Sequence, residues 1–344
     1  MTSMNAFSGN AFEVVSLSNA ITNAPFVPGF LGSLNLFTPV PETSHNILVD
    51  RQNTEFTLIP TTPINGPIPA RQQQGRNTVN LQMVHLGKSF TLMASSVQGI
   101  RAHGRSSELE SAAVKFLQEL ALVRRDVELT EEYHRLGAIQ GILLDADGTT
   151  VIYDYFTEMG EAAPVAVNFA LNVSTTDVYG IGREVARSMG RSAGGAFTPN
   201  TTINALCGDQ FYDDLIGHSN VKEFYLNSVR SRELEAASGA IFESLKVGAI
   251  TYHNYRGSDD NSAVAVPTDE CRIFPRNAEG VFSKVQGPHT TFSTVNTPGL
   301  PLYAERTFEN PVNPGESKWV KGEVHAYNLH MCMKPRVLRK GTAS

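Results

Sequence analysis

The chain has 344 residues, of which 41% are hydrophobic, and a formal net charge of −6 at pH 7. A chain of this length can bury a large core in one or two domains. The acidic balance argues against tight, nonspecific DNA binding, which needs a basic surface. No stretch approaches the run of about eighteen apolar residues that a membrane-spanning helix needs, so the sequence predicts no span.

Residues 1–49 contain no Lys or Arg, and five phenylalanines are scattered in them among Asn, Ser, Gly and Pro. Prolines and glycines are too frequent for regular elements. One interpretation is a disordered leader. We favour an arm that buries its aromatic side chains, Phe26 and Phe30 among them, against a neighbouring subunit, because a solvated tail does not need so many phenylalanines.

Residues 50–90 are also unusual. Glu55–Pro60 and Thr78–Leu86 are expected strands, and the segment between them is polar and rich in proline. Such a long connection has little core of its own. It is either a surface loop or a long hairpin that reaches over a neighbour. In the second case Arg71 and Arg76, near the tip, would seek carboxylates.

The next segment predicts two helices. A long amphipathic helix is expected from a capping box at Ser107 and Glu110, and a second, shorter helix from Thr130 to about Gly141. The residues that form the apolar stripe of the first helix are Leu109, Ala112, Ala113, Phe116, Leu117, Leu120 and Val123. Residues 106–140 hold seven Asp or Glu against four Lys or Arg. Glu108 and Glu119 are therefore candidate partners for the arginines of the hairpin.

A β-hairpin follows, with strands Ile142–Leu144 and Thr150–Phe156 around the turn Asp145–Gly148. Beyond it, short helices and strands alternate without a βαβ rhythm, which indicates an α+β fold. Expected elements are a helix over Val178–Met189 that begins at Ser174, Thr175 or Thr176, a strand Thr201–Leu206, helices Asp209–Ile216 and Val221–Asn227, and strands Val247–Tyr255 and Ala263–Val266. In a long C-terminal strand, Tyr327, Leu329, Met331 and Met333 alternate with Asn328, His330, Cys332 and Lys334, so we expect one face in the core and one in solvent.

The cysteines and histidines predict no metal or cofactor. Cys207, Cys271 and Cys332 are far apart and odd in number, which favours neither disulfides nor a zinc site and indicates synthesis in a reducing cytosol. The nine histidines form no ligand cluster by spacing. His325 and His330 are expected on opposite faces of a strand, and His330 with Cys332 lacks two further ligands.

Two stretches carry a resemblance to a known family. Leu129–Gly137 and Gly141–Phe156 resemble the signature of the lambda-like phage major capsid protein E family, which has the tailed-phage capsid fold first seen in Hong Kong 97 phage. The resemblance implies a container for DNA and no enzyme activity. It further implies an N-terminal arm (1–49), an extended loop (50–90), a peripheral domain with a long spine helix (91–156), an axial domain (157–312) and a C-terminal strand that returns to the peripheral domain (313–344).

The same resemblance implies the partners. Copies of the chain would form hexamers and pentamers of an icosahedral shell, with T=7 as the expected size, around double-stranded DNA that is bound without sequence specificity. Assembly would take place in the host cytoplasm, with a portal, a later expansion and a decoration protein at three-fold positions. Because the arm is uncharged and aromatic, we expect the scaffolding protein to be separate.

Two alternatives remain open. Ile142–Thr149 also matches the first motif of haloacid dehalogenase-type phosphatases, in which Asp145 would be the nucleophile and Asp147 the general acid, with Mg²⁺. No lysine lies between Gly148 and Asp209, and the sequence after Thr149 continues as a strand, both of which disfavour this chemistry. The other alternative is an encapsulin-like shell protein of a bacterial nanocompartment.

Overall fold

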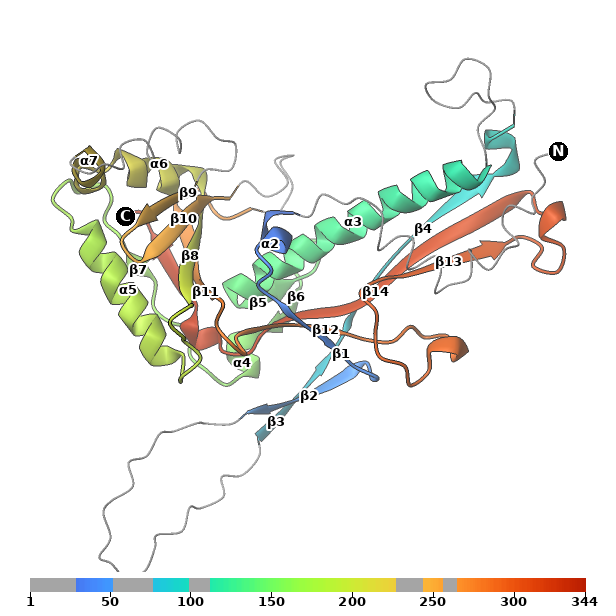
Figure 1. The fold of residues 1–344 in the computed structure, drawn as a ribbon, viewed down its shortest axis with the longest axis horizontal. Coiled ribbons are helices and arrows are strands. Elements are labelled where there is room, and N and C mark those ends of the chain that lie inside the picture. Colours follow the sequence, from blue (N-terminus) through green and yellow to red (C-terminus); the bar gives the residue numbers. More distant parts are fainter. Residues whose placement is uncertain (1–28, 52–76, 99–111, 227–243, 256–264) are drawn as a thin grey trace, which may run out of the picture.

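The computed structural model of the protein describes residues 29–51, 77–98, 112–226, 244–255 and 265–344. In these residues the chain is elongated, with a β-sheet toward each end and a long helix that runs from one toward the other (Figure 1). Helices and strands are mixed, which confirms the predicted α+β class. In the described residues no helix is both long and apolar enough to cross a bilayer.

The first sheet is built around its longest strand, β14. It consists of β1 (Thr38–Pro41), β4 (Val84–Met93), β12 (Phe282–Gln286), β13 (Tyr303–Phe308) and β14 (Trp319–Cys332). β4 pairs with one edge of β14, whereas β12 and β13 pair one after the other along the opposite edge. β1 extends the sheet as the parallel neighbour of β12. β4, β12 and β13 therefore all take β14 as a hydrogen-bonding partner, although β4 is more than 200 residues away from it in sequence.

The second sheet has six strands in the order β7-β15-β11-β8-β10-β9. Their bounds are β7 (Val167–Asn168), β8 (Thr202–Cys207), β9 (Ser244–Val247), β10 (Ile250–Asn254), β11 (Glu270–Arg276) and β15 (Arg339–Thr342). Three helices lie beside it in Figure 1: α5 (Val178–Ser192), α6 (Asp209–Gly217) and α7 (Ser219–Leu226). Short 3-10 turns occur at η3 (Ala94–Ser96), η4 (Phe292–Thr294), η5 (Pro314–Glu316) and η6 (Pro335–Val337).

One continuous helix, α3 (Ala112–Gln140), replaces the two helices predicted from the sequence. The predicted break at Thr130 is wrong, because its hydroxyl donates to the carbonyl of Asp126 at 3.1 Å inside the helix and caps nothing. With 29 residues, α3 is about 44 Å long at 1.5 Å per residue. The predicted capping box at Ser107 and Glu110 lies outside the described residues.

The first half of α3 packs its apolar stripe on the first sheet. Phe116, Leu120, Val123 and Val127 form one buried cluster with residues of β4, β13 and β14. Leu117 was expected in this stripe but is 41% exposed, so that prediction is wrong. Its position on the helix points it about 100° away from Phe116, because successive residues are separated by that angle.

The predicted hairpin is present as β5 (Ile142–Leu144) and β6 (Val151–Asp154). Its second strand ends two residues earlier than expected. The carboxylate of Asp154 accepts hydrogen bonds from the backbone N–H groups of Phe156 and Thr157 at 3.0 and 3.4 Å and so caps the short helix α4 (Tyr155–Glu158).

The C-terminal strand is present, but its predicted solvent face is wrong. Asn328, His330 and Cys332 are all 2% exposed or less. The ring of Phe37, next to β1, packs edge-on against His330 with ring centroids 5.0 Å apart. The amide of Asn328 hydrogen-bonds to Glu131 of α3. This part of β14 is covered on both faces because the chain before β1 and the long helix pack against it.

Three smaller differences from the predictions are local. Asp177, and not one of the three residues before it, caps α5 by accepting from the N–H of Gly180 at 2.9 Å. The single strand expected over Val247–Tyr255 is a hairpin, because Gly248 turns the chain with a φ of +62°. The described part of the expected strand Ala263–Val266, residues 265–266, is not a strand.

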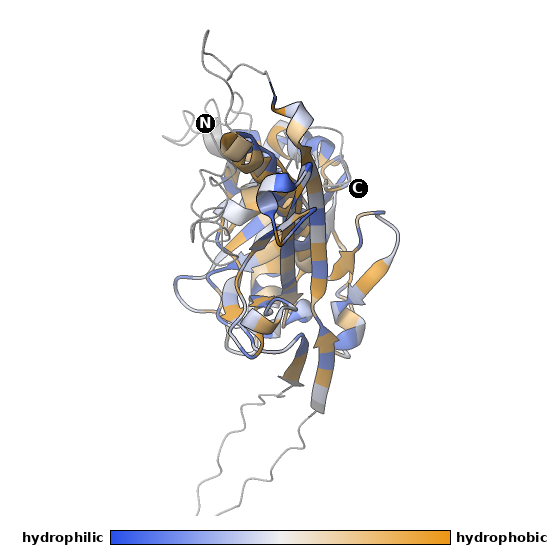
Figure 2. Ribbon diagram, turned by 90° about the vertical axis from the view of Figure 1, so that its right-hand side faces the viewer, coloured by the Kyte–Doolittle hydropathy of each residue, from blue (hydrophilic) through white to orange (hydrophobic). Residues whose placement is uncertain are grey.

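A two-stranded ribbon extends from the body of the molecule (Figure 1). It is formed by β2 (Asn46–Arg51) and β3 (Asn77–Gln82), paired antiparallel from Asn46 opposite Gln82 to Arg51 opposite Asn77. The predicted alternation is confirmed: Leu81 and Met83 are buried, whereas Asn80 and Gln82 are exposed. Figure 2 shows apolar and polar residues alternating along the strands that lead to the ribbon. The expected strand Glu55–Pro60 lies outside the described residues.

Candidate functional site

The second half of α3 carries a cluster of buried ionic side chains. We call this cluster the junction and define it as Glu131, Glu132, Arg135, Lys284 and Asn328. The Glu131 carboxylate is 1% exposed and lies 2.8 Å from Nζ of Lys284 and 2.9 Å from the guanidinium of Arg135. Arg135 also contacts Glu132 at 3.0 Å. Each buried charge thus has a partner of opposite sign, which is what makes burial of charges tolerable.

The junction also holds the chain that precedes the first sheet. The short helix α2 (Phe30–Ser33) begins against Glu132, whose carboxylate accepts hydrogen bonds from the N–H groups of Leu31 at 2.6 Å and Gly32 at 3.1 Å. The approach is so close that a Cβ on Gly29 would lie 2.5 Å from the carboxylate carbon. A negative charge at free N–H groups is favourable, so Glu132 fixes this segment to the long helix.

Glu128 lies beside the junction, and its burial together with the charged side chains of the junction shifts its pKa. Burial is the main reason why the pKa of this carboxyl is raised, and the neighbouring Glu131 adds to the effect. Arg135 opposes both, at 3.6 Å from Glu128. Three of the seven acidic residues counted in 106–140 therefore form ion pairs inside the subunit.

The base of the ribbon is fixed to the hairpin that follows α3. The hydroxyl of Tyr153 accepts from the N–H of Gln82 at 2.8 Å and donates to its carbonyl at 2.9 Å. Val49 and Leu81 are 4% and 1% exposed and belong to the main core. On the same ribbon, Leu48 is 72% exposed. One face of the ribbon thus packs on its own subunit, whereas the side chain of Leu48 is not buried by any of the described residues.

The helix α3 also exposes apolar residues. Val114, Leu117, Leu122 and Leu129 are 39–50% exposed, and we call them the outward face of α3. At 100° per residue, Val114, Leu122 and Leu129 lie on the side of the helix opposite to Phe116 and Leu120, and Leu117 lies on the flank between the two sides. Such a surface is atypical of a helix that faces only water, which usually carries polar residues there.

The residues predicted as intersubunit contacts are spread widely. Phe30 packs in its own subunit, with its ring centroid 5.2 Å from that of His253 and 6.1 Å from that of Tyr255. Glu119 forms an ion pair with Lys115 one turn away, at 3.1 Å. Phe26, Arg71, Arg76 and Glu108 lie outside the described residues. Contact of these six residues with a neighbouring subunit stays a prediction.

The two aspartates of the phosphatase interpretation sit in an exposed turn. Asp147 accepts hydrogen bonds from the hydroxyl and N–H of Thr150 and from the N–H of Thr149, and these hold its pKa well below the usual range. A general acid must instead carry a proton near neutral pH. Asp145 is engaged by the N–H of Ala146 at 2.7 Å. The hydrogen bonds that stabilise the turn therefore explain why aspartate stands at both positions, without a catalytic role.

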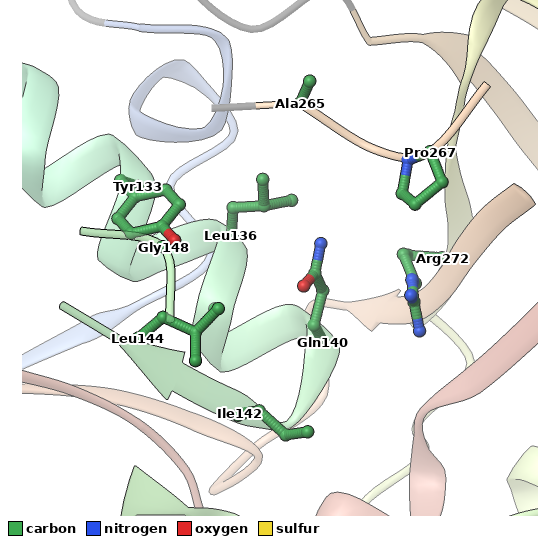
Figure 3. A pocket seen from close by; sticks show the side chains of 10 residues that line it. Tyr133, Leu136, Gln140, Ile142, Leu144, Gly148, Ala265, Pro267 and Arg272 are labelled. Atoms are coloured by element: carbon green, nitrogen blue, oxygen red, sulfur yellow. The ribbon is translucent and has the colours of Figure 1, made fainter. Parts of the chain in front are cut away.

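A pocket lies between the second half of α3, the hairpin and the chain before β11 (Figure 3). The described residues that line it are Tyr133, Leu136, Gly137, Gln140, Ile142, Leu144, Gly148, Ala265, Pro267 and Arg272. Arg272 is paired with Glu270 at 2.8 Å. None of these residues is a carboxylate, and Asp145 and Asp147 are not among them, so the pocket offers no support for phosphoryl transfer.

The prediction that the histidines form no cluster is wrong, because three of them lie close together in the folded chain. His85 on β4 lies beside His325 on β14, with Nε2 of the first 3.0 Å from Nδ1 of the second, and the ring of His289 is 5.1 Å from that of His325. Burial, more than the neighbouring His289, lowers the pKa of His325. Sequence spacing could not show this cluster, because the residues meet only when β4 and β14 pair.

Acid is expected to destabilise the subunit through His253 on β10. Burial, with a smaller contribution from Arg276, lowers the pKa of His253 to about 4, whereas an unfolded histidine titrates near 6.5. The neutral form is favoured by folding, so its stabilisation is fully present above pH 6.5 and is lost as the pH falls toward 4. Urea unfolding at pH 7.5 and 5.0 should show His253→Gln losing less stability than the wild type, by at most about 2 kcal/mol. An equal loss in both proteins would contradict this assignment.

Comparison with solved structures places the fold in a known class. The chain superposes on a protein described as a capsid protein of a prophage in E. coli CFT073 with a TM-score of 0.56 and 11% identity, covering 94% of this chain and 96% of the other. The capsid protein of cyanophage P-SCSP1u gives a TM-score of 0.50 and 10% identity, covering 93% and 90%. The fold is that of tailed-phage capsid proteins.

Sequence comparison identifies the family. The chain belongs to the phage major capsid protein E family, whose model matches residues 13–343. The major capsid protein of Salmonella phage Felix O1 is 21% identical, covering 95% of both chains, and that of Pseudomonas phage KPP10 is 26% identical, covering 97% and 98%. The chain is thus a phage major capsid protein, and its place is the shell of the virion, as the resemblance predicted.

Proposed function

We propose that copies of this chain assemble as hexamers and pentamers into an icosahedral shell around double-stranded DNA, and that each subunit lays its ribbon on a neighbour. In this proposal residues 1–49 are the arm, 50–90 the extended loop, 91–156 the peripheral domain, 157–312 the axial domain and 313–344 the returning strand. The protein acts as a structural component and not as an enzyme.

The observation that carries the proposal is the outward face of α3. Four large apolar side chains on one helix remain 39–50% exposed, although Phe116, Leu120, Val123 and Val127 of the same helix are buried. Covering apolar surface is favourable by about 25 cal/mol per Å², so a second copy that covers this face would stabilise the assembly. Leu48 at 72% exposed on the ribbon and the fully exposed ring of Phe292 extend the same argument.

The charges restrict which carboxylates the ribbon of a neighbour can reach. Glu131 and Glu132 in the junction, and Glu128 beside it, already form ion pairs inside the subunit. Glu119 is only partly covered by its ion pair with Lys115, and Asp126 pairs with Lys88 at 2.6 Å while its side chain is 45% exposed. Exposed ion pairs are weak and exchange partners readily. The proposal therefore assigns Glu119, together with Glu108, as the acidic partner of Arg71 and Arg76.

Reversing the charge of Arg71 and Arg76 is expected to block shell formation. In the double variant Arg71→Glu, Arg76→Glu, like charges would face each other across the contact, and we expect the subunit to remain folded. Electron microscopy should show no closed shells, and circular dichroism should match the wild type. The conservative Arg71→Lys, Arg76→Lys variant keeps the charge and should retain shells. Normal shells from the glutamate variant would refute the pairing.

The proposal includes partners that follow from the family. Assembly in the host cytoplasm would need a separate scaffolding protein and a portal, and a decoration protein would bind at three-fold positions of a shell that we expect to be T=7. The acidic composition, with a net charge of −6, supports a wall that packs DNA without binding it tightly.

A further inference from the structure

Three metal-binding side chains from separate segments converge beside the first sheet. His289 comes from the chain after β12, Glu305 from β13 and His325 from β14. One ligand atom from each lies within 4.8 Å of the other two. Nδ1 of His289 is 3.6 Å from the Glu305 carboxylate, and the His289 and His325 ring centroids are 5.1 Å apart.

Strand register explains why two of them meet. Tyr303 on β13 is directly opposite His325 on β14, and Glu305 is two residues further along. Residues two apart on a strand point to the same face, so Glu305 and His325 are diagonal neighbours on one side of the sheet. His289 packs over the same side, with its ring 5.2 Å from that of Tyr303.

The side chain of His289 points to a missing ligand. The residue is 5% exposed, and both of its ring nitrogens are buried without a hydrogen-bond partner in the described part of the chain. A neutral imidazole needs one donor and one acceptor partner. Buried polar groups without partners are costly, and each one in a native structure calls for an explanation. The 3.6 Å separation from Glu305 is too long for a hydrogen bond.

We propose that His289, Glu305 and His325 bind a divalent transition-metal ion, with Zn²⁺ as the best match. Two imidazoles and one carboxylate are a common ligand set for zinc, which accepts a water molecule or another ligand at its fourth position. Two ligand atoms that each lie about 2.1 Å from a tetrahedral ion are about 3.4 Å apart. The 3.6 Å between His289 and Glu305 is close to this value, and all three ligand atoms lie within 4.8 Å of one another, so side-chain rotations would bring them onto one ion.

The surroundings suit such a site. The side chain of Glu305 is 22% exposed, which leaves an entry path for the ion and room for water. His85 lies 3.0 Å from Nδ1 of His325 and can hold that ring in place. A second contact of this kind commonly orients a metal-binding histidine. The bound ion would tie the chain between β12 and β13 to β14.

The binding test uses the full-length, unassembled protein without an affinity tag. Titration calorimetry with Zn²⁺ should show one saturable site per chain. Co²⁺ should give the visible absorption bands of a tetrahedral site, and Zn²⁺ should raise the Tm. His289→Ala and Glu305→Gln should each abolish the absorption bands and the rise in Tm. Glu305→Gln should disturb the fold less than His289→Ala, because Glu305 is partly exposed. If His289→Ala fails to fold, Glu305→Gln still tests metal binding.

His253→Gln is the matched control, since it removes a half-buried histidine from the second sheet and should bind Zn²⁺ like the wild type. The proposal is overturned if the wild type shows no saturable binding. It is also overturned if Glu305→Gln, with an unchanged circular dichroism spectrum, binds Zn²⁺ and Co²⁺ as the wild type does. Neither outcome depends on shell assembly, so the result is independent of the proposed function.

Discussion

Replacing Glu131 by alanine should destabilise the folded subunit by about 3–5 kcal/mol, because it removes one partner from a buried ionic cluster. The carboxylate is 1% exposed and contacts Lys284 at 2.8 Å and Arg135 at 2.9 Å. In the variant, Nζ of Lys284 would lose this carboxylate partner in a site where only 15% of its side chain is exposed. The amide of Asn328 would also lose an acceptor.

The free energy of unfolding of the unassembled subunit, from urea denaturation, is the measurement. Glu119→Ala is the matched control, since it removes a carboxylate of the same helix from a partly exposed pair with Lys115 and should cost about 1 kcal/mol or less. If Glu131→Ala lowers the free energy of unfolding by no more than Glu119→Ala does, the junction does not stabilise the subunit more than a partly exposed ion pair.

Replacing Phe116 by alanine should cost a similar amount, about 3–5 kcal/mol, through an apolar cavity. The ring is fully buried, and its centroid is 5.0 Å from that of Phe90 on β4. Both rings lie over Gly322 of β14, where a Cβ would come within 2.3 Å of Phe90 and 3.0 Å of Phe116. Because the backbone of β14 forms one wall of this site, the surrounding structure cannot easily collapse into the space.

Leu117→Ala is the control for Phe116→Ala. It removes an apolar side chain from the next position of α3, where 41% of the residue is exposed, and should cost about 1 kcal/mol or less in the unassembled subunit. The same variant should weaken shell formation if the outward face of α3 is covered in the assembly. Equal losses of subunit stability in the two variants would contradict the packing described for this helix.

The local elements were predictable because their signals are local. The apolar periodicity from Leu109 to Val123 predicts a helix, and the Asp-Ala-Asp-Gly turn predicts the hairpin β5–β6; the structure contains the hairpin and, from Ala112 on, the helix. The signature at 129–156 predicted the family, which the match over residues 13–343 confirms. The break at Thr130 was wrongly placed, because a threonine followed by two glutamates is typical of a helix start and equally compatible with the middle of a buried helix.

The junction could not be predicted, because its partners are distant in sequence. Leu31 and Glu132 are 101 positions apart, and Glu131 and Asn328 are 197 apart. The polar side of β14 was expected in solvent for the same reason, since nothing near Asn328 or His330 indicates what covers it. One signal was available: Glu131 and Arg135 are spaced one turn apart beside buried apolar positions, which favours a paired, buried cluster.

The central position of the last strands has a consequence for how the subunit is made. β14 lies between β4 and the pair β12 and β13, and β15 lies between β7 and β11. Until the ribosome has translated residues 319–342, strands made earlier present unpaired edges, which are prone to wrong association. Neither sheet can close on a nascent chain that stops before residue 319. We therefore expect prematurely terminated products to be unable to enter a particle, without any separate proofreading step.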